Sequence, residues 1–405
     1  MNRTLRGVAV FLLLASPVLG AEPSIQRSDL WEAGKDGYAI YRIPGIVTTA
    51  KGTVLAYCEA RRTGKSDWDT IDILLRRSTD GGITFDAPRK IADVPGPHKK
   101  NPVALAQKLA NPDDVTYNNA VAIGDPKAGT VHFLFCLEYH RCFYQRSDDD
   151  GRTFSKPVEI TSAFEAFRKD YDWKVLATGP AHGIQLKNGR LVVPIWLSTG
   201  TGGHAHRPSV TSVIFSDDQG KTWQRGDIAV PNNEKYVNPN ETVIAQLADG
   251  RVMLNVRSES KDHRRLVTTS ADGATNWSAP VFHEQLLEPI CMASICRLTE
   301  TPASDKNRLL FANPDTLDPR KGQVEKPGQS RDRKNLSMKL SYDEGKTWAI
   351  NRVLEAGPSG YSDLAVLPDG TILCLYERGA SRALTLARFN LEWLTEGKDK
   401  LPAGR

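Results

Sequence analysis

Two short polar segments in the first part of the chain carry residue types that could act on an acidic molecule. Tyr41-Arg42-Ile43-Pro44-Gly45 places an arginine before a proline, which would hold its guanidinium rigid. Glu59-Ala60-Arg61-Arg62 is followed by Ser66-Asp67-Trp68-Asp69 and then Asp72, a polar, loop-like stretch that could hold an acid over a pocket. A planar, permanently charged guanidinium suits a carboxylate. A nearby carboxyl group could transfer protons.

Two further segments lie in the second half of the chain. Glu241 precedes one predicted strand, and Arg257 ends the next, which we place at Val252–Val256. Because these strands would be antiparallel neighbours, we expect Glu241 and Arg257 to emerge at the same rim. Arg331-Asp332-Arg333 and Gly360-Tyr361-Ser362-Asp363-Leu364 each precede another strand. Taken alone, each segment is also consistent with surface arginines and solvated loops.

A repeat of the form Ser-x-Asp-x-Gly-x-Thr-aromatic indicates the secondary-structure elements that position these residues. Successive copies begin 69, 69, 54 and 71 residues apart. Ser and Asp fold back onto their own backbone, Gly supplies a positive φ, and the aromatic residue fills a core, so each copy predicts a hairpin turn. The five copies are Ser78–Phe85, Ser147–Phe154, Ser216–Trp223, Ser270–Trp277 and Ser341–Trp348.

Strand-like apolar runs precede most of these turns. We predict strands at Ile71–Leu75, Val131–Leu137 and Ser209–Phe215, and one at Ile46–Tyr57 before the first copy. A four-stranded antiparallel unit that returns with each turn is typical of a propeller blade. The sequence therefore predicts an all-β fold, a six-bladed β-propeller, with residues 22–405 as a single domain.

The distribution of charged residues argues against binding to nucleic acid. The 405 residues carry a formal net charge of +5, but Lys and Arg are dispersed, and a nucleic-acid binder would show a basic stripe.

Residues 1–21 resemble a signal peptide, with Arg3 and Arg6 before a short apolar core and small residues at Gly20 and Ala21. That core is too short to span a bilayer. We predict export to the periplasm or medium with cleavage after Gly20 or Ala21, an uncleaved anchor being the alternative.

The six cysteines and eight histidines form no metal-ligand pattern. Cys58, Cys136 and Cys374 lie in apolar runs and are expected to be buried thiols, which are common in protein cores. Cys291 and Cys296 are the pair that we would first test for a disulfide. No metal or cofactor is expected.

The ordered motifs, from about Tyr41 to Glu377, resemble the exo-α-sialidases, or neuraminidases, of bacteria and animals. The order is RIP, EAR, an aspartate before RRSTDGG, GPAHGIQL, NE with NVRS, RDRKNL, and GYSDLAVLPDG. Each motif is weak by itself, and the ordered set between the repeated turns is specific. Two departures are Ala181, where glycine is commoner, and Asn276, where the fourth turn usually has threonine.

The resemblance implies a substrate-binding role for several arginines. In the family, three arginines clamp the carboxylate of sialic acid, and the matching positions are Arg42, Arg257 and Arg333. Arg331 is an alternative to Arg333. Arg61 matches an arginine near the 4-position of the sugar. The implied partners are sialylated glycans on glycoproteins, glycolipids or oligosaccharides.

The resemblance also implies a catalytic trio. Tyr361 matches the family's nucleophile, Glu241 the carboxylate that activates it, and Asp67 the acid/base residue, with Asp69 and Asp72 as alternatives. A neutral phenol avoids the repulsion that a carboxylate nucleophile would meet at an anionic sugar, and sialidases are a known exception to the two-carboxylate scheme. The implied reaction is hydrolysis with net retention through a tyrosyl-sugar intermediate.

Three other functions stay open at this stage. The chain could be a non-catalytic glycan-binding propeller, a trans-sialidase, or a glycosidase for another α-keto acid sugar. Transfer would need an aromatic platform for the acceptor at the mouth of the pocket. Trp68, Trp173 and Trp196 are the candidates for that platform.

Overall fold

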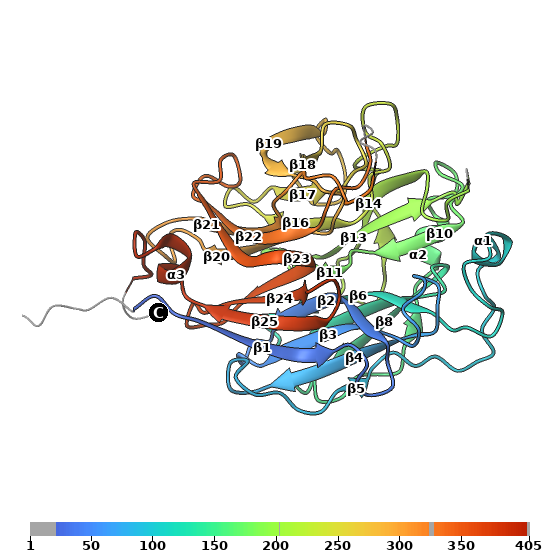
Figure 1. The fold of residues 1–405 in the computed structure, drawn as a ribbon, viewed down its shortest axis with the longest axis horizontal. Helices are drawn as coiled ribbons and strands as arrows, with labels where there is room; N and C mark the ends of the chain where they lie inside the picture. Colours follow the sequence, from blue (N-terminus) through green and yellow to red (C-terminus); the bar gives the residue numbers. More distant parts are fainter. Residues whose placement is uncertain (1–21, 202, 324–327, 403–405) are drawn as a thin grey trace, which may run out of the picture.

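The computed structural model describes residues 22–201, 203–323 and 328–402, and it consists mainly of antiparallel strands (Figure 1). This confirms the all-β prediction. The predicted signal peptide lies outside the described residues. Three short helices accompany the strands: α1 (Pro102–Ala106), α2 (Ser162–Glu165) and α3 (Leu391–Thr395).

Four of the five sheets have four or five strands. Their strands pair antiparallel except β11 with β6, which is parallel. In pairing order, the first sheet consists of β2 (Ile40–Thr48), β3 (Val54–Arg61), β4 (Ile71–Ser78) and β5 (Arg89–Lys90). The second sheet consists of β11 (Ala181–His182), β6 (Tyr117–Gly124), β7 (Val131–Leu137), β8 (Arg141–Ser147) and β9 (Val158–Glu159). The next two are β10 (Val175–Thr178), β13 (Leu191–Ser198), β14 (Ser209–Ser216), β15 (Gln224–Arg225), with β12 (Ile184–Gln185) on β13, and β16 (Thr242–Gln246), β17 (Val252–Val256), β18 (Arg264–Ser270), β19 (Val281–Leu287).

The fifth sheet has seven strands, so six separate blades are not what the pairing shows. Its order is β1 (Ile25–Glu32), β25 (Ala383–Phe389), β24 (Ile372–Arg378), β23 (Ile350–Val366), β22 (Lys334–Ser341), β21 (Arg308–Pro314), β20 (Ser294–Thr299). The physical reason is β23, which runs for 17 residues without a break. Its first half pairs with β22 and its second half with β24.

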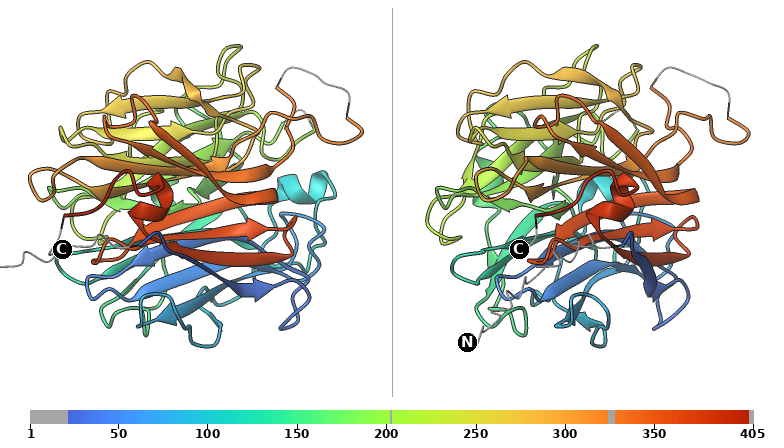
Figure 2. Two further views of the ribbon diagram at one scale, coloured as in Figure 1. Left: turned by 60° about the vertical axis from the view of Figure 1, so that its left-hand side comes forward. Right: turned by 90° about the vertical axis from the view of Figure 1, so that its left-hand side faces the viewer.

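The sheets follow one another around a common centre. Strand β2 contacts β6, β6 contacts β12, β12 contacts β16, β16 contacts β20, β20 contacts β23, and β23 returns to β2. One strand at the start of the described chain completes the arrangement, because β1 pairs with β25 from Ile25↔Phe389 to Glu32↔Ala383. Figure 2 shows this blue strand beside the red C-terminal strands.

Most strand predictions match the structure, and one is wrong. The predicted strands at Val131–Leu137 and Val252–Val256 are β7 and β17. The single strand predicted at Ile46–Tyr57 is instead a hairpin between β2 and β3. Gly52 has φ +78°, and Thr49 donates to Thr53 across the turn at 2.9 Å.

The repeated turns have the hydrogen bonds that their sequence predicts. In the first copy, Ser78 Oγ accepts from the amide of Gly82 at 2.8 Å, and the Thr84 hydroxyl donates to Asp80 at 2.6 Å. The fourth copy is different because its loop is one residue shorter before the threonine. Thr275, rather than Asn276, donates to Asp272 at 3.1 Å. The departure at Asn276 therefore leaves the turn intact.

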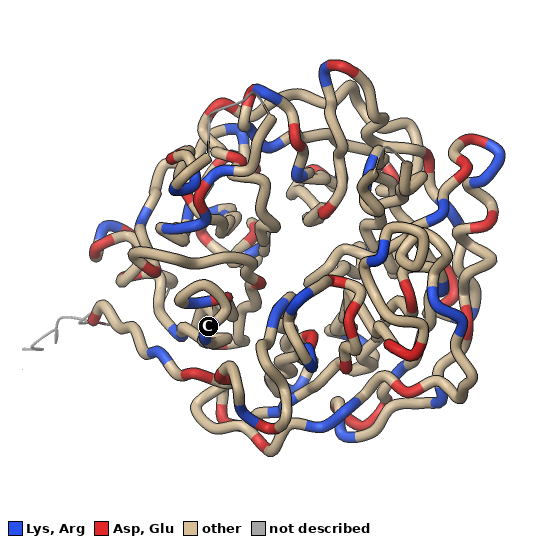
Figure 3. The backbone as a smooth tube through the Cα atoms, turned by 45° about the vertical axis from the view of Figure 1, so that its right-hand side comes forward, with Lys and Arg blue, Asp and Glu red and all other residues tan. Residues whose placement is uncertain are grey.

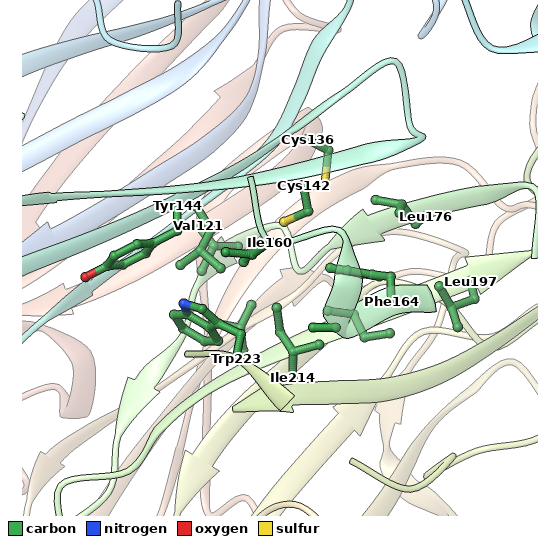
Figure 4. Close-up of a cluster of buried hydrophobic side chains, with 14 of the residues drawn as sticks. Val121, Cys136, Cys142, Tyr144, Ile160, Phe164, Leu176, Leu197, Ile214 and Trp223 are labelled. Carbon is green, nitrogen blue, oxygen red and sulfur yellow. The ribbon is translucent and has the colours of Figure 1, made fainter. Parts of the chain in front are cut away.

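Each turn contributes its aromatic residue to a different hydrophobic cluster. Figure 4 shows one cluster, in which Trp223 packs against Tyr144 between the second and third sheets. Cys136 and Cys142 face each other across β7 and β8 in the same cluster. All six cysteines lie in the described part of the chain and are free thiols, so Cys291 and Cys296 form no disulfide.

The charged residues are dispersed in the structure, as the sequence predicts. In the view of Figure 3 the basic and acidic positions are interspersed along the backbone, without one dominant stripe. Within the described residues, no helix has the length and apolar character needed to cross a bilayer.

Candidate active site

One cavity of about 260 Å³ contains every residue that the sequence singled out for the site. Five arginines and three carboxylates line it, so it favours an anion. The seven expected residues in its wall are Arg42, Arg61, Asp67, Glu241, Arg257, Arg333 and Tyr361. The alternatives lie elsewhere: Asp69 binds the Thr63 hydroxyl, Asp72 accepts from Tyr38 at 2.7 Å, and Arg331 is not in the wall.

A β-bulge turns Arg42 into this cavity. The register between β2 and β3 shifts between Arg42 and Gly45, and Ile43 takes a φ of +54°, which is unusual for a β-branched residue. Pro44 has no amide hydrogen to lose from the ladder. Gly45 is required by close approach, since a Cβ there would lie 2.1 Å from the Tyr57 ring.

A second bulge places Tyr361. The register of β23 against β24 shifts between Ser359 and Ser362. Gly360 leaves room for the Glu377 carboxylate, from which a Cβ would be only 2.2 Å away. Glu377 accepts from the Tyr361 amide at 3.1 Å and from Arg42 Nε at 3.0 Å. It therefore ties the tyrosine backbone to the arginine.

The Tyr361 hydroxyl is the centre of the cavity's polar contacts. It lies 2.6 and 2.7 Å from the two carboxylate oxygens of Glu241 and 2.8 Å from Arg257 Nη1. Arg257 also pairs with Glu241. The guanidinium carbons of Arg42 and Arg333 lie 5.1 and 5.3 Å from the centre of the tyrosine ring.

Glu241 and Arg257 reach this point together, as the sequence predicts. Glu241 directly precedes β16 and Arg257 directly follows β17. Their backbones pair, with the Arg257 amide donating to the Glu241 carbonyl at 3.0 Å. The two side chains therefore share one rim.

Asp67 lines the same cavity from the loop between β3 and β4. Its carboxylate accepts from Arg61 at 2.6 Å and lies 3.7 Å from Arg42, while 43% of its side chain remains exposed. Burial works against ionisation, but Arg61 and Arg42 outweigh it and hold the pKa of Asp67 well below its usual range. The free protein therefore holds Asp67 as an anion.

An aromatic cluster supports the Asp67 loop. Trp68 packs against Tyr139 with 4.5 Å between ring centres and against His206 with 5.5 Å. Burial lowers the pKa of His206 to about 4, so this ring is neutral at ordinary pH. Trp196 completes the cluster.

Arg333 differs from the other cavity arginines in its partners. Arg42, Arg61 and Arg257 each pair with a carboxylate. Within the described residues, Arg333 has none, and its Nη2 donates only to the Ile290 carbonyl at 2.6 Å. Its charge is thus available to an incoming anion.

Several residues of the site were not found from the sequence. Asn119 and Glu259 line the cavity, and Glu377 and Glu59 bind its arginines Arg42 and Arg61. Glu59 was visible in the motif EAR, and its pairing with Arg61 at 2.7 Å explains that spacing. Within the described residues, no group of three or more His, Cys, Asp or Glu side chains could hold a metal ion.

Comparison with known proteins decides the family. A model of the BNR repeat-like domain matches residues 106–374. A sialidase of Bacteroides fragilis is 30% identical over 85% of this chain. The chain belongs to the sialidase family. A sialidase of Micromonospora viridifaciens is 29% identical over 93% of the chain. The chain spans 61% and 55% of the lengths of these two relatives.

Solved sialidases have the same β-propeller-type fold. The Hadza microbial sialidase Hz136 is 29% identical, with a TM-score of 0.72 over 91% of this chain and 69% of its own. The sialidase of Trypanosoma rangeli in covalent complex with 2,3-difluorosialic acid is 18% identical. Its TM-score is 0.67 over 91% of this chain and 59% of its own.

Proposed function

We propose that this chain is an exo-α-sialidase that hydrolyses terminal sialic acids from glycoconjugates with net retention of configuration. The observation that carries the proposal is the Tyr361 hydroxyl, 2.6 Å from Glu241 and 2.8 Å from Arg257 in an arginine-lined cavity. A protein that only bound glycans would have no use for a phenol paired with a carboxylate. The pair therefore favours catalysis over simple binding.

Substrate binding begins with the three arginines around Tyr361. Arg42 lies in β2, Arg257 directly follows β17 and Arg333 directly precedes β22. A carboxylate bound between the three would set the anomeric carbon beside the phenol oxygen. Charge-assisted bonds to guanidinium groups compensate the anion for its lost water. Fixing the ring in this position also removes much of the entropic cost of attack.

Tyr361 attacks as a phenol that loses its proton during the reaction. Burial raises the pKa of Tyr361, and the guanidinium groups of Arg257, Arg333 and Arg42 oppose the rise without abolishing it. The resting side chain is therefore protonated. As its oxygen bonds to the anomeric carbon, its proton passes to Glu241.

Asp67 supplies the proton that the departing group needs. When the substrate carboxylate binds Arg42, it offsets that guanidinium and adds a negative charge, and both effects raise the pKa of Asp67. Protonated Asp67 then donates to the glycosidic oxygen as its bond to the anomeric carbon breaks. In the second half, Asp67 takes a proton from water, the hydroxide bonds to the anomeric carbon, and Tyr361 leaves and regains its proton from Glu241.

Burial of the three tryptophans favours hydrolysis over transfer. Trp68, Trp173 and Trp196 are only 2, 0 and 3% exposed, so none presents the open ring face that an acceptor platform needs. Water is then the acceptor.

The proposal also covers the number of blades, the export of the chain and its partners. Counting the two halves of β23 separately turns the seven-stranded sheet into two four-stranded units and gives six blades, with residues 22–405 as one domain. Residues 1–21 direct export. The partners are sialylated glycans, with neither nucleic acid nor a membrane span in the mature chain.

The decisive experiment uses residues 22–405, a fluorogenic aryl sialoside and 2,3-difluorosialic acid. We expect hydrolysis of the sialoside and, after peptide mapping, a sugar label on Tyr361. Tyr361→Phe keeps the ring but removes the attacking oxygen, so it should fold normally and lose activity by orders of magnitude.

Asp67→Ala serves as the matched comparison, because it should affect substrates with poor leaving groups far more than the aryl sialoside. A label on Glu241 or Asp67, or rapid hydrolysis by Tyr361→Phe, would overturn the mechanism.

A further inference from the structure

Asp363 is a buried anion two residues beyond Tyr361 on β23, and it is fully shielded from solvent. Its carboxylate lies 2.6 Å from His182 Nδ1, 2.9 Å from Ser294 Oγ and 2.8 Å from the Ile46 amide. These donors belong to β11, β20 and β2. One side chain thus joins the strand of the tyrosine to three others.

The contacts of His182 favour its charged form. Burial lowers the pKa of His182, but the charge of Asp363, its hydrogen bond and the Ile295 carbonyl outweigh burial and raise it. The Nδ1 of His182 lies 2.6 Å from the Asp363 carboxylate, which favours the imidazolium form. The other titratable groups near Asp363 are Tyr57, Cys296 and Cys374, and burial raises the pKa of each, so they are neutral.

The pair lies between two cavities along the centre of the molecule. Arg42 and Tyr361 border the active-site cavity. Farther along the same strands, Ile46 and Leu364 border a second cavity of about 380 Å³, which His182 also lines. The pair therefore forms the layer beneath the floor of the active site.

Strand geometry links the pair to the nucleophile. Asp363 follows Tyr361 by two residues on β23, directly after the bulge that places the tyrosine. Asp363 also grips β2 at Ile46, four residues beyond Arg42. Any shift of the Asp363 carboxylate would move β23 against β2, and with it Tyr361 against Arg42.

We propose that the His182–Asp363 ion pair is a positioning device that holds the Tyr361 oxygen in line with the anomeric carbon. The inference rests on the proposed function of Tyr361 as nucleophile. A displacement of about 1 Å in a reacting atom can cost roughly 100-fold in rate. Neither residue of the pair contacts the substrate, so the pair acts through Tyr361.

The test is Asp363→Asn, which keeps the shape of the side chain and removes its charge. We expect the rate of labelling by 2,3-difluorosialic acid, and kcat for an aryl sialoside, to fall by roughly 10- to 100-fold. The dissociation constant of a non-covalent sialic acid analogue should stay within about threefold, since the arginines are untouched. Ser294→Ala deletes one donor and keeps both charges, so it should show the same split, more weakly, if Asp363→Asn fails to fold.

Asp399→Asn is the matched control. Asp399 is also buried, pairs with Arg308 at 2.8 Å and accepts from Tyr342 at 2.8 Å, outside both cavities. It should lower stability and leave the labelling rate unchanged. Equal labelling rates for Asp363→Asn, Ser294→Ala and the unaltered protein would overturn the inference. It would also be overturned if the labelling rate fell as much in Asp399→Asn as in Asp363→Asn.

A pH profile separates positioning from simple loss of stability. Without the Asp363 charge, burial should lower the pKa of His182, so kcat of Asp363→Asn should fall further as pH rises through the His range of about 6. The unaltered protein should lack this limb, and its presence there would contradict the inference. If the unaltered protein carries no label on Tyr361, the proposed function fails rather than the positioning.

Discussion

At the scale of single residues, Asp67 lies where the binding of an anion changes its protonation state. In the free protein two guanidinium groups hold it ionised, and 43% of its side chain is exposed. A carboxylate bound at Arg42 competes for the same positive charge. Binding and protonation are therefore linked, and the sign of the linkage is proton uptake.

Binding of a non-hydrolysable sialic acid analogue in mildly acidic solution should consume a proton at Asp67. The pKa of Asp67 is depressed in the free protein and rises in the complex, so uptake is greatest between the two values. Calorimetry in two buffers of different ionisation enthalpy measures the number of protons. Asp67→Asn should bind without uptake, and an unchanged uptake in that variant would assign the proton to another group.

Arg257→Lys should reduce kcat/KM by about 1.5–3 kcal/mol of transition-state stabilisation. One nitrogen of Arg257 contacts both Tyr361 and Glu241, and a flexible ammonium cannot also bind a carboxylate with a planar fork. Arg251→Lys, in the same β16–β17 hairpin, is the control because its partner Asp249 is exposed. Equal efficiency of the two variants would remove Arg257 from the site.

At the scale of elements, bulges aim the site. Three strands shift register where they reach the cavity: β2 after Arg42, β6 at Asn119 and β23 before Ser362. Bulges re-aim single side chains without ending a strand. Arg42, Asn119 and Tyr361 are therefore aimed from within strands, whereas Asp67 and other lining residues lie in the segments between strands.

Gly360→Ala should disturb the site without unfolding the sheet. A methyl group would collide with the Glu377 carboxylate, which cannot move without releasing Arg42 and the Tyr361 amide. We expect kcat/KM to fall roughly 10- to 100-fold. Gly96→Ala is the control, since no atom lies closer than 3.9 Å to the new methyl position. Activity equal to that control would show that Glu377 relaxes freely.

The sequence predicted which residues meet better than it predicted how they meet. Glu241 and Arg257 were placed correctly at one rim because strand ends follow from turn signals. Glu377 was missed because its contact with Arg42 crosses from one sheet to another. The bulge at Ile43 was missed because its left-handed backbone contradicts the local preference of isoleucine, which tertiary contacts override.

At the scale of the whole molecule, the fold depends on a strand from the start of the chain. Strand β1 covers the outer edge of β25 and brings Leu30 and Trp31 into the cluster that contains Leu384 and Leu386. The six-blade count was predicted from the length of the chain, the repeated turns and the family resemblance. Gly357-Pro358-Ser359-Gly360 is typical of a break between two strands, so the sequence could not show that the last two units share β23.

Removal of residues 1–32 should lower the free energy of unfolding by at least about 3 kcal/mol. The estimate counts only the lost burial of Leu30 and Trp31, at about 1.5–3 kcal/mol each. Removal of residues 1–21 should leave folding and activity unchanged. Urea titration of both truncated chains measures the difference, and equal midpoints would mean that β25 is stable as an edge.

The pairing of β1 with β25 also sets the timing of folding. Their partners are separated by more than 350 residues, so this contact cannot form until almost the whole chain has been synthesised. Contacts of such long sequence separation slow folding. The intervening hairpins can form early, each around its own turn. The first strand must then wait, unpaired, for the last, and any machinery that delivers the chain from its N-terminus has to protect that waiting edge until the two ends meet.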